Sequence, residues 1–169
     1  MEFRFETIYD QKSMTAMAKA LRKTIRKKRS RRSHILGWCV VALGMILLFT
    51  ASETTTNLIL TLLAVLAIVA VLIWEDPING YVAKRRGLPG LTQSIVTFRE
   101  DGYHSETAIG SSDFSYGTIM RFVETKAYFV FVFSQSHAQI YDKRTISGGT
   151  CEEFAEFITV KTGLAVESV

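Results

Sequence analysis

The sequence predicts a membrane-embedded α-helical hairpin with two transmembrane helices, joined to a small cytoplasmic α+β domain. The first observation is a pair of uncharged apolar stretches, residues 33–52 and 54–74, separated only by Glu53. Each has about the 20 residues that an α-helix needs to cross the hydrocarbon core of a bilayer. The second observation is a change of pattern after residue 90, where short β-type segments alternate with turn residues before a final helical pattern.

The distribution of charge predicts how the hairpin is oriented. Residues 1–34 contain eleven Lys and Arg against three acidic residues, whereas residues 91–169 contain six against ten. The loop expected at about residues 51–57 contains neither Lys nor Arg. Because basic residues are retained on the cytoplasmic side, we expect a multi-pass protein of the inner (cytoplasmic) membrane with both termini in the cytoplasm.

We expect four segments. Residues 1–34 form an N-terminal strand and a basic amphipathic helix, and residues 35–74 form the hairpin, with spans at about 35–52 and 56–74. Residues 75–90 are a juxtamembrane linker, and residues 91–169 form the cytoplasmic domain. Within the linker, Pro77 and Asn79-Gly80 mark where the second helix can bend or stop. Trp38 and Trp74 fall near the same face of the bilayer, so we expect them to be interfacial anchors.

The N-terminal arm combines a strand pattern with a helical one. Phe3, Phe5 and Thr7 occupy alternate positions, which indicates a short strand with one buried face. A helix is expected from about Gln11, and its apolar stripe consists of Met14, Met17, Leu21 and Ile25. Two interpretations follow for this helix. It lies on anionic lipid headgroups, or its stripe packs on the cytoplasmic domain while its charges only enforce the topology.

Basic residues on both sides of the hairpin are the predicted contacts with the membrane surface, where each contributes on the order of 1 kcal/mol beside anionic lipids. Nucleic acid is not expected as a ligand, because lipid phosphates compete for these residues and no aromatic side chains are interleaved with them. The predicted surface contacts are Arg22, Lys23, Arg26, Lys27, Lys28, Arg29, Arg31, Arg32, Lys84, Arg85 and Arg86.

For the cytoplasmic domain the pattern predicts an antiparallel sheet with one C-terminal helix. Asp101-Gly102 is a strong hairpin signal. Thr150 and Glu153 have the spacing of a capping box, and Gly163 is placed to end that helix. The expected strands are 94–98, 103–109, 114–116, 118–124, 128–133 and 138–141, with a turn at 110–113, and the run 128–133 is apolar on both faces as in a central strand.

The order of these segments resembles that of a known family. The residues that carry the resemblance are Val96-Thr97-Phe98-Arg99-Glu100-Asp101-Gly102, Tyr116-Gly117-Thr118-Ile119, Val123-Glu124-Thr125, Asp142-Lys143-Arg144 and Cys151-Glu152-Glu153-Phe154-Ala155-Glu156-Phe157. The chain is similar to the YcxB-like family of small bacterial membrane proteins. This resemblance implies a cytoplasmic sheet domain like bacterial pleckstrin-homology-like domains, completed by the N-terminal strand, and no settled activity. Asp142 stands where the family often has proline.

The sequence contains no recognisable catalytic, cofactor-binding or metal-ligating motif, so an enzyme is not expected. His34, His104 and His137 are isolated from one another, without the spacing of metal ligands. Cys39 lies in the first apolar stretch and Cys151 near the other end of the chain, which does not fit a disulfide framework.

Three functions remain as hypotheses. The first is a membrane-tethered binding or regulatory module that engages a protein partner in a groove between sheet and helix. The second is an immunity or transporter-accessory membrane subunit. The third is sensing of anionic lipids through the basic N-terminal arm, because the acidic domain itself would be repelled by them. Small residues in the spans also allow close helix approach or a homo-oligomer: Gly37, Gly44, Ala64, Ala67 and Ala70.

Overall fold

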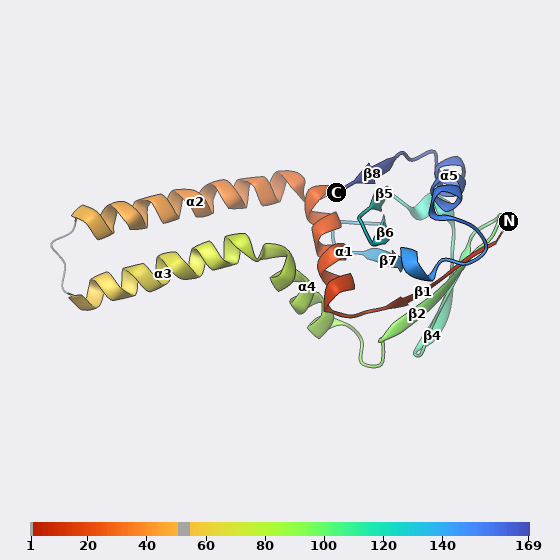
Figure 1. Ribbon diagram of the computed structural model, residues 1–169, viewed down its shortest axis with the longest axis horizontal. Coiled ribbons are helices and arrows are strands. Elements are labelled where there is room, and N and C mark those ends of the chain that lie inside the picture. Colours follow the sequence, from red (N-terminus) through yellow and green to blue (C-terminus); the bar gives the residue numbers. More distant parts are fainter. Residues whose placement is uncertain (1, 51–54) are drawn as a thin grey trace.

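The computed structural model describes residues 2–50 and 55–169, so most of the loop predicted between the two spans lies outside the described residues. Figure 1 shows two long helices that run side by side from a domain of two sheets, with two shorter helices between them and the domain. The long helices are α2 (Lys27–Thr50) and α3 (Thr55–Ile73), called the helical pair below. Both are long and apolar enough to cross a membrane, and only 6% of the most apolar window of each is buried.

Glycines line the contact between the two helices of the pair. A Cβ atom at Gly37 would lie 2.7 Å from Leu72, and one at Gly44 would lie 2.5 Å from Val65. Each glycine therefore lets α2 and α3 approach closely within one chain, which is one of the roles expected from the sequence.

The segment predicted as a linker is mostly helical. Helix α4 spans Glu75–Arg86 and begins directly after Trp74, where α3 has ended. Pro77 lies in the first turn of α4, where its missing N–H would have no intrahelical acceptor in any case. It therefore accompanies the start of a new helix instead of ending one. On the other side of the pair, α2 begins at Lys27 and includes basic residues that the sequence placed in the N-terminal arm.

The first sheet joins the N-terminal strand to the C-terminal part of the chain, as the resemblance implied. Its order is β1-β2-β3-β4, and all pairs are antiparallel. Phe5 lies opposite Val96 across the β1–β2 pair, and the predicted hairpin at Asp101-Gly102 connects β2 to β3. The strands are β1 (Phe3–Ile8), β2 (Gln93–Phe98), β3 (Tyr103–Thr107) and β4 (Gly110–Phe114).

The second sheet has the order β7-β6-β5-β8, with β6 as an internal strand, as its two apolar faces predicted. Its strands are β5 (Arg121–Glu124), β6 (Tyr128–Val132), β7 (Ala138–Asp142) and β8 (Val166–Ser168), and β8 is parallel to β5. Two short 3-10 helices, η1 (Tyr116–Thr118) and η2 (Lys143–Thr145), connect the elements around these strands.

Several details of the sheet domain differ from the sequence prediction. There are two sheets instead of one, and strand β8 was not predicted. Tyr116 and Thr118, expected in strands, belong to η1, and β5 begins only at Arg121. Residues 110–113, predicted as a turn, form most of β4. Strand β4 was missed because it is an edge strand whose residues before Phe114 are all exposed. It therefore has no alternation of apolar and polar residues to detect.

The core of the domain is aromatic and lies between the two sheets. Helix α5 (Cys151–Thr162) packs on this core with Phe154 and Ile158, both fully buried. The Phe154 ring contacts rings from both sheets, including Phe5 at 4.7 Å and Phe129 at 5.2 Å between centroids. The predicted capping box at Thr150 is present, and Gly163 ends the helix with a left-handed φ of 69°.

Helix α1 (Gln11–Lys23) covers the outer face of the second sheet. Its buried Ala20 and Leu21 share a hydrophobic cluster with Val130 and Ile140. Of the two interpretations of the basic helix, the structure therefore supports packing on the sheet domain. This contact also explains why both faces of β6 are buried.

Candidate functional site

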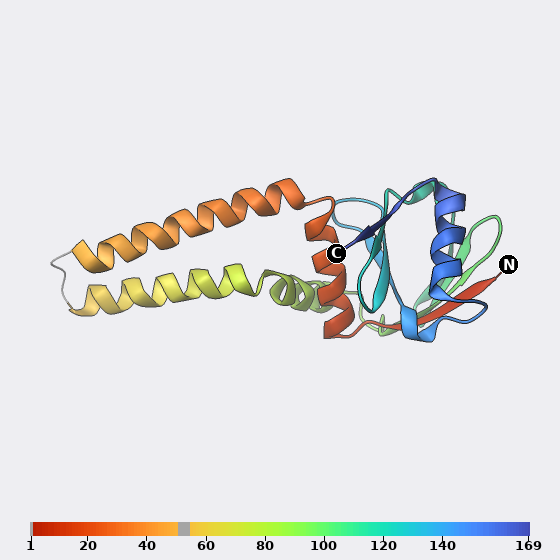
Figure 2. The same ribbon diagram turned by 45° about the horizontal axis from the view of Figure 1, so that its top comes forward.

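The candidate site is the junction at which α1, α2 and α4 meet between the helical pair and the sheet domain. Figures 1 and 2 both show α1 crossing between α4 and the second sheet. Asp10 accepts a hydrogen bond from the backbone N–H of Ser13 at 2.7 Å and so caps the start of α1. This bond is the largest cause of the lowered pKa of Asp10. Because one face of α1 is fixed on the sheet, its other face can hold α4.

Helices α1 and α4 cross in close contact at Gly80. This glycine is buried, and a Cβ atom built on it would lie 2.7 Å from the backbone nitrogen of Thr15. Nearby, Gln11 donates a hydrogen bond from Nε2 to the carbonyl oxygen of Pro77 at 3.0 Å. The crossing therefore depends on a residue without a side chain, because a larger one would meet the backbone of α1.

An ion pair lies beside this crossing. Arg22 on α1 donates from Nε to Oδ1 of Asp76 at 2.6 Å and from Nη2 to Oδ2 at 2.7 Å. Hydrogen bonding to Asp76 is the main cause of the raised pKa of Arg22. The side chains are 26% and 15% exposed, so water screens this pair less than it would a surface pair.

Glu75 connects the same cluster to α2. Its Oε2 atom lies 2.6 Å from Nε2 of His34 and accepts from the buried Ser30 hydroxyl at 3.2 Å. It also lies 3.7 Å from Nε of Arg22. Two consecutive acidic residues at the start of α4 thus tie it to both α1 and α2. We call Arg22, Ser30, His34, Glu75 and Asp76 the junction cluster.

The predicted membrane-surface residues divide into two groups. Arg22 and Arg26 bind inside the chain, the second by donating from Nε to the carbonyl oxygen of Gln135 at 2.6 Å. This differs from the expectation that all of them face lipid. Trp38 and Trp74 are 51% and 58% exposed. The remaining basic residues are exposed near the same end of the helical pair: Lys23, Lys27, Lys28, Arg29, Arg31, Arg32, Lys84, Arg85 and Arg86.

A shallow surface depression lies beside the end of α1. Lys23, Lys126 and Lys143 line it together with Glu124 and residues of β8. Lys143 forms an ion pair with Glu124 and lies 4.6 Å from the centroid of the Phe129 ring. The depression therefore contains both charge signs, and one of its lysines is already paired.

The adjacent Arg144 is also paired within the chain. Its Nε donates to Oδ1 of Asp142 at 3.0 Å, and bonding to Arg144 is the largest cause of the lowered pKa of Asp142. Asp142 thus forms an ion pair with Arg144, whose side chain is 75% exposed.

The three histidines have different contacts. His34 belongs to the junction cluster, His104 lies 2.6 Å from Asp113 through Nδ1, and His137 lies 3.0 Å from the Ser134 hydroxyl. Among the described residues, no group of three His, Cys, Asp or Glu side chains could hold a metal ion. Cys39 and Cys151 are free thiols.

The junction cluster and Gly80 were missed by sequence reasoning. The adjacent pair Glu75-Asp76 after an apolar span was visible, but its partners lie at least 41 positions away along the chain. No local spacing connects them. These residues meet because α3 returns antiparallel beside α2, which brings the start of α4 close to α1 and α2.

The structure thus defines a protein whose apolar helical pair and two-sheet domain meet at a charged junction. Residues 98–158 match the model of the family described as YcxB-like protein, which confirms the resemblance in the part of the chain where the quoted motifs are densest. The matched segment runs from the end of β2 to Ile158 of α5 and contains neither β1 nor the helical pair. No curated protein shows significant similarity to the chain.

Proposed function

We propose that this protein is a non-enzymatic, membrane-tethered binding or regulatory module of the bacterial cytoplasmic membrane, whose sheet domain engages a protein partner. The helical pair supports the membrane location. A core helix of a water-soluble protein is mostly buried, whereas α2 and α3 expose large apolar side chains along their length, such as Leu43, Phe49, Leu60 and Leu66. Such surfaces need a nonpolar environment.

Charge and aromatic residues support an orientation with both termini in the cytoplasm. The exposed lysines and arginines of α2 and α4 lie at the end of the helical pair that adjoins the sheet domain. Trp74 directly follows α3 at that same end, and Trp38 is next to Gly37, which lies against Leu72 near the end of α3. In this proposal both tryptophans are interfacial aromatic anchors. The sheet domain would then lie directly below the inner face of the membrane.

The junction cluster supports a role that needs a fixed orientation. A flexible tether requires no contacts between anchor and domain, yet here α4 is bound to α1 and α2, and α1 is packed on the second sheet. The domain is therefore held at one height and angle. We include the pleckstrin-homology-like relationship in this proposal, supported by the two sheets and the C-terminal helix.

Strand β4 is the best candidate for the docking surface. The groove expected between sheet and helix is filled, because Phe154 and Ile158 of α5 are fully buried and Phe157 contacts the Phe3 ring. By contrast, within the described residues β4 pairs only with β3, and residues 110–113 are exposed. An open edge can add an extended peptide as a further strand through main-chain hydrogen bonds. This exposed edge is the observation that carries the proposal.

A photo-crosslinking amino acid at Ser111 of the full chain, in native membranes, tests this proposal. We expect a specific protein adduct at Ser111 that is lost when Asp113→Pro removes an outward-facing backbone N–H from the edge. The matched control is the same crosslinker at Glu152, exposed on α5. Equal adducts at both positions, or an adduct unaffected by Asp113→Pro in a protein that still folds, would reject β4 as the docking edge.

A further inference from the structure

Helix α4 has two faces of different character. Its buried or half-buried residues lie on the side toward α1: Glu75, Asp76, Gly80 and Ala83. At about 100° per residue, the positions opposite them are 74, 77, 78, 81 and 85. Four of these five are exposed apolar or aromatic residues, namely Trp74, Pro77, Ile78 and Tyr81. Trp74, Ile78 and Tyr81 are 58%, 40% and 57% exposed.

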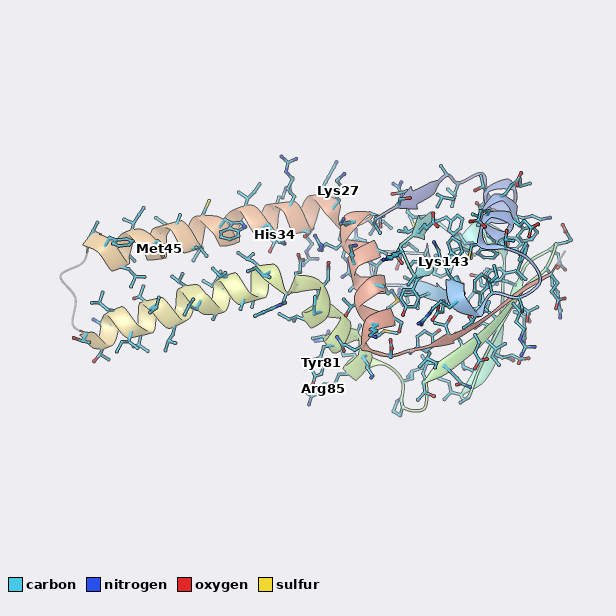
Figure 3. All side chains as sticks on the ribbon, viewed as in Figure 1. Lys27, His34, Met45, Tyr81, Arg85 and Lys143 are labelled. Carbon is cyan, nitrogen blue, oxygen red and sulfur yellow. The ribbon has the colours of Figure 1, made fainter. Side chains whose placement is uncertain are left out.

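The exposed face of α4 carries basic residues at its far end. Lys84, Arg85 and Arg86 form the last turn. Figure 3 shows Tyr81 and Arg85 together on the side of α4 that is turned away from α1. Exposed apolar residues followed by lysine and arginine suit contact with the interface of a membrane that contains anionic lipids.

We propose that this face of α4 lies in the headgroup layer of the inner leaflet, with Ile78 and Tyr81 at the boundary of the acyl chains. The proposal rests on the membrane location proposed above. Lipid is the contact of this face because only Trp74 separates α4 from the apolar helix α3. Charge also favours lipid, because Lys84, Arg85 and Arg86 complement anionic phospholipids and would repel a basic partner.

This placement gives α4 a second role besides connecting two parts of the chain. One face of the helix contacts lipid, and the other binds α1 through Gly80 and Asp76. Since α1 is packed on the second sheet, the depth of α4 in the headgroups sets the angle at which the sheet domain is held. The lipid surface is thus part of the support of the domain.

Spin labels on single cysteines test this in the full chain, with Cys39 and Cys151 replaced by alanine. The protein is reconstituted in vesicles of phosphatidylethanolamine and phosphatidylglycerol, and accessibility to oxygen and to a water-soluble nickel complex is measured. We expect labels at Ile78 and Tyr81 to show a severalfold higher ratio of oxygen to nickel accessibility than a label at Glu152. Asn79, exposed on another face of the same helix, is the matched control and should give a lower ratio.

A label at Leu60 on α3 separates this proposal from the membrane location itself, because Leu60 is exposed on the helical pair. If Leu60 is lipid-exposed while Ile78 and Tyr81 are as water-accessible as Glu152, the α4 proposal is wrong and the anchor stands. If Leu60 is also water-accessible, the membrane location is wrong. Labels at 78 and 81 shielded from both reagents would indicate a protein cover, either a second copy or a partner, and would also overturn the proposal.

Discussion

Arg22 and Asp76 form a bidentate ion pair across 54 positions of the sequence, and the whole helical pair lies between them. Arg22 belongs to the helix that is packed on the sheet domain, whereas Asp76 belongs to the helix that continues from α3. The pair therefore joins the two halves of the molecule. Its partly buried position makes it a contributor to stability as well as to orientation.

Removal of either partner should destabilise the junction. We expect Arg22→Ala and Asp76→Ala each to lower the free energy of unfolding by about 2 kcal/mol, because each leaves a half-buried charge without its hydrogen bonds. Thermal unfolding in detergent micelles measures this effect. The double variant should cost less than the sum of the single ones, and Arg86→Ala, at an exposed position of α4, should have little effect. Strict additivity would show that the two side chains do not interact.

The close crossing of α1 and α4 should not tolerate a side chain at Gly80. Gly80→Val should separate the helices and cost roughly 1–3 kcal/mol, because the neighbouring atoms belong to the backbone of Thr15 and cannot rotate away. Gly117→Ala is the control, since its Cβ would meet its nearest neighbour at an ordinary 3.8 Å. Unchanged thermal stability of Gly80→Val would contradict the crossing.

The sheet domain should need the N-terminal strand to fold. Phe3 and Phe5 are fully buried, and a Phe-to-Ala change in a core costs about 3–5 kcal/mol. Residues 91–169 alone lack this strand, and we expect them to show no cooperative unfolding. A chain in which a Gly/Ser linker replaces residues 27–86 keeps β1 and α1 and should fold. Circular dichroism melts of both proteins decide the matter, and a cooperative melt of 91–169 alone would refute this dependence.

Alkaline pH should destabilise the sheet domain through its buried tyrosines. Burial raises the pKa of Tyr141 well above 10.0, and burial likewise raises the pKa of Tyr116. Below pH 10 both states hold these protons. Above it, the unfolded state loses them while the folded state retains them, so the free energy of unfolding falls as the pH rises. Denaturant titrations between pH 8 and about 11 measure the slope, and Tyr141→Phe should reduce it. An equal slope in that variant would show that Tyr141 does not contribute.

Elements with a strong local pattern were predicted well from the sequence. The alternation at Phe3, Phe5 and Thr7 predicted β1, and the signals at Thr150 and Gly163 predicted α5 with its cap and its end. The two apolar faces of β6 predicted an internal strand, although not that α1 covers one of them. Patterns within a segment show how much of it is buried but do not identify the partner.

The parts that were missed depend on contacts between distant segments or on exposed strands. Strand β4 has exposed serines and no alternation, so its sequence resembles a turn. Glu75 and Asp76 have no partner nearby in the sequence, and only the fold shows that His34 and Arg22 bind them. Gly80 looked like a helix breaker in the sequence. Its role in the crossing was missed because its close neighbour, Thr15, lies on another helix.

The central claim is that the helical pair crosses the membrane and holds the sheet domain on the cytoplasmic side. The substitution Glu152→Cys, in the full chain with both native cysteines replaced by alanine, tests it most directly with a membrane-impermeant maleimide. The account predicts labelling in inverted membrane vesicles and none in intact cells whose outer barrier has been made permeable to the reagent. Labelling at position 152 in such intact cells, or release of the unlabelled protein from membranes by alkaline carbonate, would contradict it.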